Sequence, residues 1–194
     1  MADPSGETWE RAIAFIGGTG AGKSTFAALS VAAGAKFLTD DLLCAVPTGD
    51  GVAVRGGCAE LRLRRAARGV AELFPGAPTR TTLDDRLALT LGEGSLGTRS
   101  LGLLVFPNVS DGTGKMTVSA LTPSEVVLRL AGSPRMSGWL SRRVLENQLH
   151  CLAKMANEVT AVHVEVPWSD APRADQANAL IGQLKAAMWR AAPT

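Results

Sequence analysis

The chain has 194 residues, of which 46% are hydrophobic and 20% are charged, and its formal net charge is +2. This length and apolar content predict one globular domain over residues 11–194, behind a disordered lead-in of residues 1–10. The charge is nearly balanced, the sequence has no long basic stripe, and only 5% of the residues are aromatic. We therefore expect no nucleic-acid partner.

The cysteines and the hydropathy of the chain indicate in which cellular compartment the protein works. The three cysteines, Cys44, Cys58 and Cys151, are widely spaced and odd in number, which predicts neither a disulfide framework nor a cysteine metal site. The polar first residues do not resemble a signal peptide, and no apolar run approaches the roughly 20 residues that span a bilayer. We therefore expect a cytoplasmic protein without a membrane partner.

In chain order, the hydrophobic pattern alternates strands with helices at both ends and is richer in strand in the middle. The predicted strands cover residues 12–18, 35–41, 101–109, 115–121 and 160–167, and a hairpin covers residues 42–57. The predicted helices cover residues 23–34, 58–74, 123–132, 137–159 and 173–192; Thr122 and Glu125 form a capping-box signature before the third of them. Residues 75–100 carry turn formers and stay unassigned. The pattern predicts an α/β class with a mixed sheet and flanking helices.

The stretch "GGTGAGKST", residues 17–25, lies between the first predicted strand and the first predicted helix. It satisfies the pattern G-x-x-x-x-G-K-[ST] through Gly17, Gly22, Lys23 and Ser24, in the strand–loop–helix context that the pattern requires. Glycines let successive backbone N–H groups point at phosphate oxygens, and the helix N-terminus adds positive potential. The stretch therefore predicts a P-loop NTPase fold that binds a nucleoside triphosphate with Mg²⁺.

Each polar residue of this loop has an expected role. Lys23 is expected to reach the β- and γ-phosphates as a catalytic cation, Ser24 to ligate Mg²⁺ and Thr25 to touch the α-phosphate. The predicted phosphate-binding residues are Gly17, Gly18, Thr19, Gly20, Ala21, Gly22, Lys23, Ser24 and Thr25.

The next predicted strand ends in two aspartates, "FLTDD". A carboxylate at the end of a strand beside a phosphate loop can hold Mg²⁺ or take the proton from an attacking hydroxyl. Because adjacent residues of a strand point to opposite sides, the two aspartates should not share one task. We assign Asp40 as the general base and Asp41 to metal or loop positioning; the alternative is a pair of turn or capping aspartates.

The segment "GGTGAGKSTFAALSVAAGAKFLTDD" resembles the HPr serine kinase/phosphorylase family, in its short single-domain branch that includes peptide-modifying kinases. Three later segments, "AELRLRRAARGVAELF", "ALTPSEVVLRLAG" and "VHVEVPWSD", resemble the family by residue type. The resemblance implies transfer of the γ-phosphoryl group of ATP to a hydroxyl, commonly that of a serine in a peptide or protein. It also implies that Asp40 accepts the proton and that Glu60 of "AELR" helps hold the metal. The segment before the loop has no histidine where the family carries one, so phosphorolysis is not implied.

Arginines and histidines further along the chain are weaker candidates. Arg135 in "GSPRMSGW" is a candidate stabiliser of charge on the transferred phosphoryl group; a surface arginine is the alternative. His150 and His163 are expected to be structural, because no convergent metal ligands can be placed beside them.

Other functions stay open at this point. The arginine-rich stretches "RLRRAAR" and "SPRMSGWLSRR" fit the lid of a small-molecule kinase, and a nucleotide-binding regulatory protein without transfer activity is a further alternative. The guanine-reading motif of GTPases is absent. The acceptor could be a peptide, a protein or a small hydroxylated molecule, and a homo-oligomer stays open.

Overall fold

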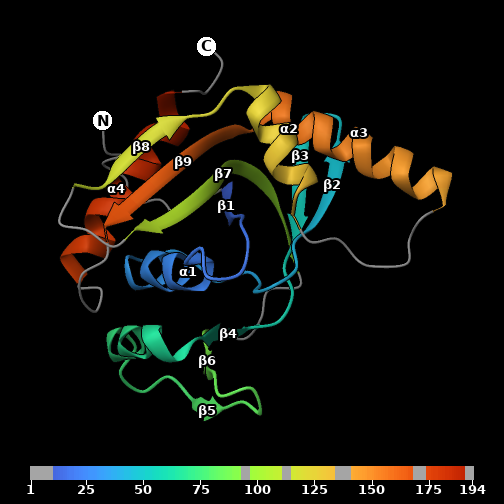
Figure 1. Cartoon of the computed structure of the whole chain (residues 1–194). Helices are drawn as coiled ribbons and strands as arrows, with labels where there is room; N and C mark the ends of the chain where they lie inside the picture. The colour runs from blue at the N-terminus through green and yellow to red at the C-terminus, as the bar shows by residue number, and fades with distance from the viewer. Residues whose placement is uncertain (1–10, 93–96, 111–114, 134–140, 168–173, 191–194) are drawn as a thin grey trace.

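The structure, a computed structural model, describes residues 11–92, 97–110, 115–133, 141–167 and 174–190 (Figure 1). Its fold is mixed α/β, with a six-stranded mixed sheet and a separate three-stranded antiparallel sheet. This confirms the predicted class and the mixed sheet with flanking helices. The predicted lead-in, residues 1–10, lies outside the described residues.

The central sheet is organised around one long strand. In order, its strands are β2-β3-β7-β9-β8, and β1 also pairs with β7. The strands are β1 (Arg11–Phe15), β2 (Cys44–Thr48), β3 (Gly51–Arg55), β7 (Thr98–Ser110), β8 (Thr117–Ala120) and β9 (Thr160–Pro167). Since β1, β7 and β9 run parallel, their carboxyl ends meet at one edge, where α/β proteins commonly place a binding site.

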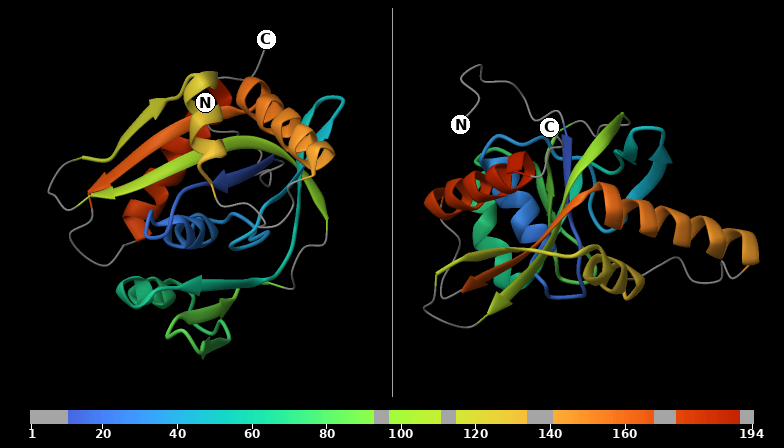
Figure 2. Two further views of the ribbon diagram at one scale, coloured as in Figure 1. Left: turned by 45° about the vertical axis from the view of Figure 1, so that its right-hand side comes forward. Right: turned by 90° about the horizontal axis from the view of Figure 1, so that it is seen from above.

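Four helices cover the two faces of this sheet (Figures 1 and 2). They are α1 (Lys23–Ala32), α2 (Pro123–Ala131), α3 (Arg142–Glu158) and α4 (Ala174–Arg190). Alternate residues of β7 face opposite sides: Leu103 and Val105 pack with α1 and α4, and Leu104 and Phe106 pack with α2 and α3. All four side chains are buried, so β7 is the spine of two apolar cores.

The smaller sheet lies on the other side of α1 from the central sheet (Figure 1). Its order is β4 (Glu60–Leu63), β6 (Leu87–Thr90) and β5 (Thr79–Thr81), and the 3₁₀ helix η1 (Arg65–Leu73) follows β4. Leu61, Leu63 and Leu89 are fully buried in a third core with Ala28 of α1. Helix α1, which begins at the end of the glycine-rich loop, is therefore held from both sides.

The predicted helix over residues 58–74 is wrong. Residues 60–63 form β4, and a 3₁₀ helix covers residues 65–73. Leu61 and Leu63 are buried at a spacing of two, which is the period of a strand, and both oppose leucines of β6. Long-range pairing with β6 therefore overrides the helix-forming composition of this segment.

The predicted strand over residues 35–41 is also wrong, since the segment joins no sheet. Its backbone groups bond elsewhere: the Leu38 carbonyl accepts from Gly57 N–H at 2.8 Å, and the Asp40 carbonyl accepts from Leu42 N–H at 2.7 Å. Asp41 has φ 61°, a left-handed conformation that breaks an extended run. The aspartates thus lie on an irregular crossing segment rather than at a strand end.

Several local predictions are confirmed. The hairpin pairs Cys44–Thr48 with Gly51–Arg55 in antiparallel register. Helix α2 begins with a complete capping box, in which Glu125 N–H donates to Thr122 Oγ1 and Thr122 N–H donates to the Glu125 carboxylate. Helix α3 begins at Arg142, later than predicted, and residues 134–140 lie outside the described residues.

None of the helices in the described ranges is both long and apolar enough to cross a membrane.

Candidate phosphate-binding and catalytic site

The glycine-rich loop lies at the carboxyl ends of the parallel strands. After β1, Ile16 N–H donates to the Val105 carbonyl of β7 at 2.8 Å, which extends the pairing to the first glycine of the loop. Helix α1 begins at Lys23 with Gly22 as its N-cap, so the loop delivers the chain directly to a helix N-terminus. This brings the first turn of α1, whose first N–H groups have no acceptor within the helix, next to the loop backbone.

Gly22 has a steric reason to be glycine. Its φ is 86°, and a Cβ on it would lie 2.8 Å from Cγ2 of Val109 and 2.9 Å from Cε2 of Phe26. A side chain would have to displace the end of β7 or the first turn of α1, which are the two elements that shape the loop. Gly20 is also left-handed, with φ 87°, but open space surrounds it.

Lys23 folds back over the loop that precedes it. Its Nζ donates to the Gly18 carbonyl at 2.8 Å. The amine therefore lies at the start of the loop, where it can exchange this carbonyl for a phosphate oxygen. Thr25, the predicted α-phosphate contact, is buried at 8% exposure, and that contact stays a prediction.

Asp40 connects the loop helix to the small sheet. Ser24 Oγ donates to Asp40 Oδ1 at 3.2 Å, and the backbone N–H of Arg62 in β4 donates to Asp40 Oδ2 at 2.9 Å. Both carboxylate oxygens are thus held, one from each side, although Asp40 lies on an irregular segment. A hydroxyl oxygen and a carboxylate oxygen side by side are ligands of the kind that Mg²⁺ prefers.

The other predicted metal ligands are arranged differently. Asp41 is exposed, and Ser24 contacts its neighbour Asp40 instead. The Glu60 carboxylate is paired with two arginines: Arg62 Nε lies 3.1 Å from Oε1, and Arg80 Nε lies 2.9 Å from Oε2. No group of three or more histidine, cysteine, aspartate or glutamate side chains that could hold a metal occurs in the described part of the chain. A Mg²⁺ ion here would therefore need nucleotide phosphates and water to complete its coordination.

Hydrogen bonds from Arg80 and Arg62 lower the pKa of Glu60 below its usual range. A carboxylate with a depressed folded-state pKa stabilises the fold above its unfolded-state pKa, and this stabilisation disappears as the pH falls through the folded-state pKa. We expect Glu60→Gln to lower the melting temperature at pH 7 by about 2–4 °C, that is about 1 kcal/mol. The difference from wild type should shrink as the pH falls below about 4.3, the ordinary glutamate value.

Thermal melts across that pH range check this prediction. The matched control is Glu146→Gln, which removes an exposed pair with Arg142 on α3 and should change the melting temperature much less. A Glu60→Gln difference that stays constant down to pH 3 would show that the Glu60 charge does not stabilise the small sheet.

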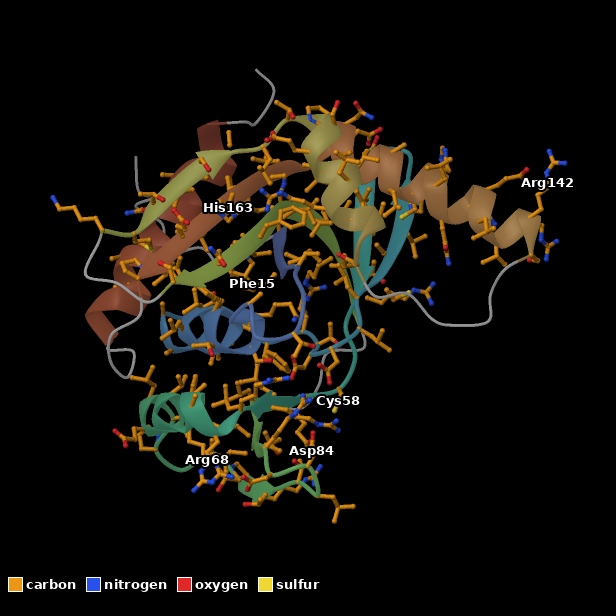
Figure 3. All side chains as sticks on the ribbon, viewed as in Figure 1. Phe15, Cys58, Arg68, Asp84, Arg142 and His163 are labelled. Atoms are coloured by element: carbon orange, nitrogen blue, oxygen red, sulfur yellow. The ribbon has the colours of Figure 1, made fainter. Side chains whose placement is uncertain are left out.

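Sequence reasoning missed a hollow of about 380 Å³ beside Gly17 and Gly18. Arg129 of α2 and His163 of β9 line it, together with Phe106 of β7. His163 lies on β9 (Figure 3), and its Nδ1 lies 2.9 Å from the Phe106 carbonyl, which can only accept, so Nδ1 donates this hydrogen bond. The alternation of "TAVHVEVP" places His163 on one side of β9, but no local signal says that this side meets the loop.

Arg135, the predicted charge stabiliser, lies outside the described residues.

No protein-family model matches the chain, and no curated protein matches it in sequence.

Proposed function

We propose that the protein is a P-loop kinase that transfers the γ-phosphoryl group of ATP to a hydroxyl, in the first place that of a serine in a peptide or protein. The observation that carries the proposal is the contact between Ser24 Oγ and Asp40 Oδ1 at 3.2 Å, one residue after Lys23. It places a carboxylate beside the metal-binding position of a sequence that satisfies the full phosphate-loop pattern. This arrangement supplies the cation, the metal ligand and the base that the reaction requires.

The loop residues fit a triphosphate with Mg²⁺. A Cβ on Gly22 would collide with Val109 and Phe26, which pack behind the loop, and the Lys23 amine lies on the loop carbonyl of Gly18. The Ser24 hydroxyl and the Asp40 carboxylate would hold the metal directly or through water, and a bound Mg²⁺ would neutralise charge on the β- and γ-phosphates. Gly17–Thr25 would bind the phosphates, and Asp41 and Glu60 stay predicted contributors to metal binding.

In this mechanism the residues of the chain mainly position the reacting groups and neutralise the charge of the phosphates. Lys23 would hold the terminal phosphates against the loop, and the Arg62 N–H and Ser24 would keep Asp40 oriented. Asp40 would accept the proton of the acceptor hydroxyl as its oxygen attacks the γ-phosphorus. The bond from that phosphorus to the β–γ bridging oxygen would break, leaving ADP with its electron pair.

The strand beside the loop favours this reading over a nucleotide-hydrolysing motor or switch. In those proteins a metal-holding aspartate follows the strand next to the loop strand. Here β7 runs beside β1 as far as Ser110, and its residues next to the start of the loop, Phe106, Pro107 and Asn108, carry no carboxylate. Asp111, the first acidic residue after β7, lies outside the described residues. Asp40 supplies the carboxylate from a different segment, as the resemblance to HPr-kinase-like proteins implies.

Incubation with Mg-ATP and a panel of acceptors tests the proposal. The panel contains a serine-bearing peptide library, HPr-type proteins and hydroxylated metabolites, and mass spectrometry detects the added phosphate. We expect Lys23→Met to weaken ATP binding by about 10–100-fold, since a charged hydrogen bond to phosphate is worth about 1.5–3 kcal/mol. Lys36→Met, at an exposed lysine just after α1, is the matched control and should bind ATP as wild type does.

Three outcomes separate the candidate functions. A phosphorylated peptide or protein supports the proposal, and phosphorylation of a metabolite alone supports the small-molecule kinase instead. Tight ATP binding without transfer to any acceptor favours a regulatory protein. Failure to bind ATP would contradict all three.

A further inference from the structure

The hollow beside the loop lies on the side of the central sheet that α2 covers. Its lining includes Gly17 and Gly18 of the loop, Phe106 and Asn108 of β7, Arg129 of α2 and His163 of β9. Three elements that are distant in sequence therefore converge on the first residues of the loop.

The hollow borders the end of the loop where a terminal phosphate would lie. The Lys23 amine donates to the Gly18 carbonyl, and Gly18 is part of the hollow's lining. In a phosphate loop this lysine reaches the β- and γ-phosphates. An acceptor that enters the hollow would thus approach the γ-phosphate and not the nucleoside.

Arg129 lines this hollow as an exposed residue of α2, in electrostatic contact with Glu125 one turn earlier but without a salt bridge in the described part of the chain. Its guanidinium carbon lies 5.5 Å from the centroid of the Phe106 ring, a cation–π distance. Among the described residues no carboxylate lies within ion-pair distance of it. Val126 and Leu130, three residues before and one residue after Arg129 on α2, are buried, so the part of the helix that carries Arg129 is anchored to the core.

Two arginines of the small sheet, which contacts Asp40 through the backbone of β4, are already engaged. Arg62 and Arg80 both pair with the Glu60 carboxylate on the small sheet. Within the described residues, Arg129 is the arginine that lines the hollow beside the loop, and it forms no salt bridge. A cation aimed at the developing charge of the transferred group is a recurring requirement of phosphoryl transfer.

We propose that Arg129 is a catalytic residue that contacts the transferred phosphoryl group, and that the hollow admits the hydroxyl-bearing residue of the acceptor. This inference rests on the proposed kinase function. In the transfer, the acceptor oxygen forms the new bond to the γ-phosphorus while Asp40 takes its proton, and the bridging oxygen leaves with ADP. Arg129 would stabilise the non-bridging oxygens of that phosphoryl group throughout, and it loses no proton.

Steady-state kinetics of Arg129→Met give the first test. Methionine keeps an apolar side chain over Phe106 but removes the charge. We expect kcat to fall about 10²–10³-fold while the KM for ATP changes by less than about threefold, because the interaction is made mainly in the transition state. Arg99→Met is the matched control: Arg99 is exposed at the amino-terminal end of β7, away from the loop at the carboxyl ends of the parallel strands, and its substitution should leave kcat unchanged.

Calorimetry supplies a readout that does not depend on turnover. Mg-ADP with aluminium fluoride imitates the transferred group, so wild type should bind it more tightly than Mg-ADP alone. Arg129→Met should lose most of this difference and keep its affinity for Mg-ADP. Circular dichroism of each variant checks that the fold is retained.

The outcomes distinguish this inference from the function on which it rests. If wild type transfers phosphate and Arg129→Met does so equally well, the inference is overturned and the kinase stands. Loss of kcat in Arg135→Met with Arg129→Met unaffected overturns it in the same way. If wild type neither transfers phosphate nor binds the aluminium fluoride complex more tightly than Mg-ADP, the proposed function fails and the inference fails with it.

Discussion

Asp40→Asn is expected to reduce phosphoryl transfer by about 10²–10⁴-fold while ATP still binds. The carboxylate is held by Ser24 Oγ on Oδ1 and by Arg62 N–H on Oδ2. An asparagine can keep both contacts: its carbonyl oxygen accepts from Arg62 N–H, and its amide donates to the Ser24 hydroxyl, which can rotate to accept. The substitution therefore removes the charge and the proton-accepting capacity with little change in shape.

Single-turnover transfer and ATP titration on the same protein samples measure the two effects separately. Asp41→Asn is the comparison variant, because Asp41 is exposed and the Ser24 contact goes to Asp40. We expect Asp41→Asn to lower transfer much less than Asp40→Asn does. Equal losses in both variants would argue that the two carboxylates act only on the metal, and undiminished transfer by Asp40→Asn would remove Asp40 as the base.

Local sequence signals predicted the elements that carry the loop. An apolar run ended by glycines indicated β1, and the Thr122–Glu125 capping box located the start of α2, because both signals lie within a few residues of the structure they specify. The site's connection to the small sheet was not predictable in this way. It depends on β4, whose partner Leu87–Thr90 lies more than twenty residues further along the chain.

Asp40 lies near Ser24 as its spacing in the sequence predicted, although the local structure that was expected to bring it there does not form. The expectation of a carboxylate near Ser24 came from a strand over residues 35–41, and that strand does not form. Asp40 lies beside Ser24 because side-chain and backbone hydrogen bonds hold an irregular segment there. Arg129 and His163 escaped prediction for a related reason, since only the packing of α2 and β9 on β7 brings them to the loop.

Gly22→Ala is expected to destabilise the protein by about 2–5 kcal/mol and to prevent tight nucleotide binding. A left-handed φ costs a non-glycine residue about 1–2 kcal/mol, and overpacking a well-packed position costs about 1–3 kcal/mol more. Both apply here, since φ is 86° and the new Cβ would lie 2.8 Å from Val109 and 2.9 Å from Phe26. Because Gly22 also caps α1, either the helix start or the end of β7 must move, and the phosphate cradle moves with it.

Two other glycines of the loop separate these causes in thermal melts. Gly18→Ala meets nothing within 4 Å and has no left-handed φ, so its melting temperature should stay close to wild type. Gly20→Ala has φ 87° but open space around it, so it should show the conformational cost alone. Gly22→Ala should show both, with a drop on the order of 10 °C. A melting temperature of Gly22→Ala no lower than that of Gly20→Ala would mean that Val109 of β7 and Phe26 of α1 do not pack tightly against Gly22. The loop would then not be a rigid phosphate cradle.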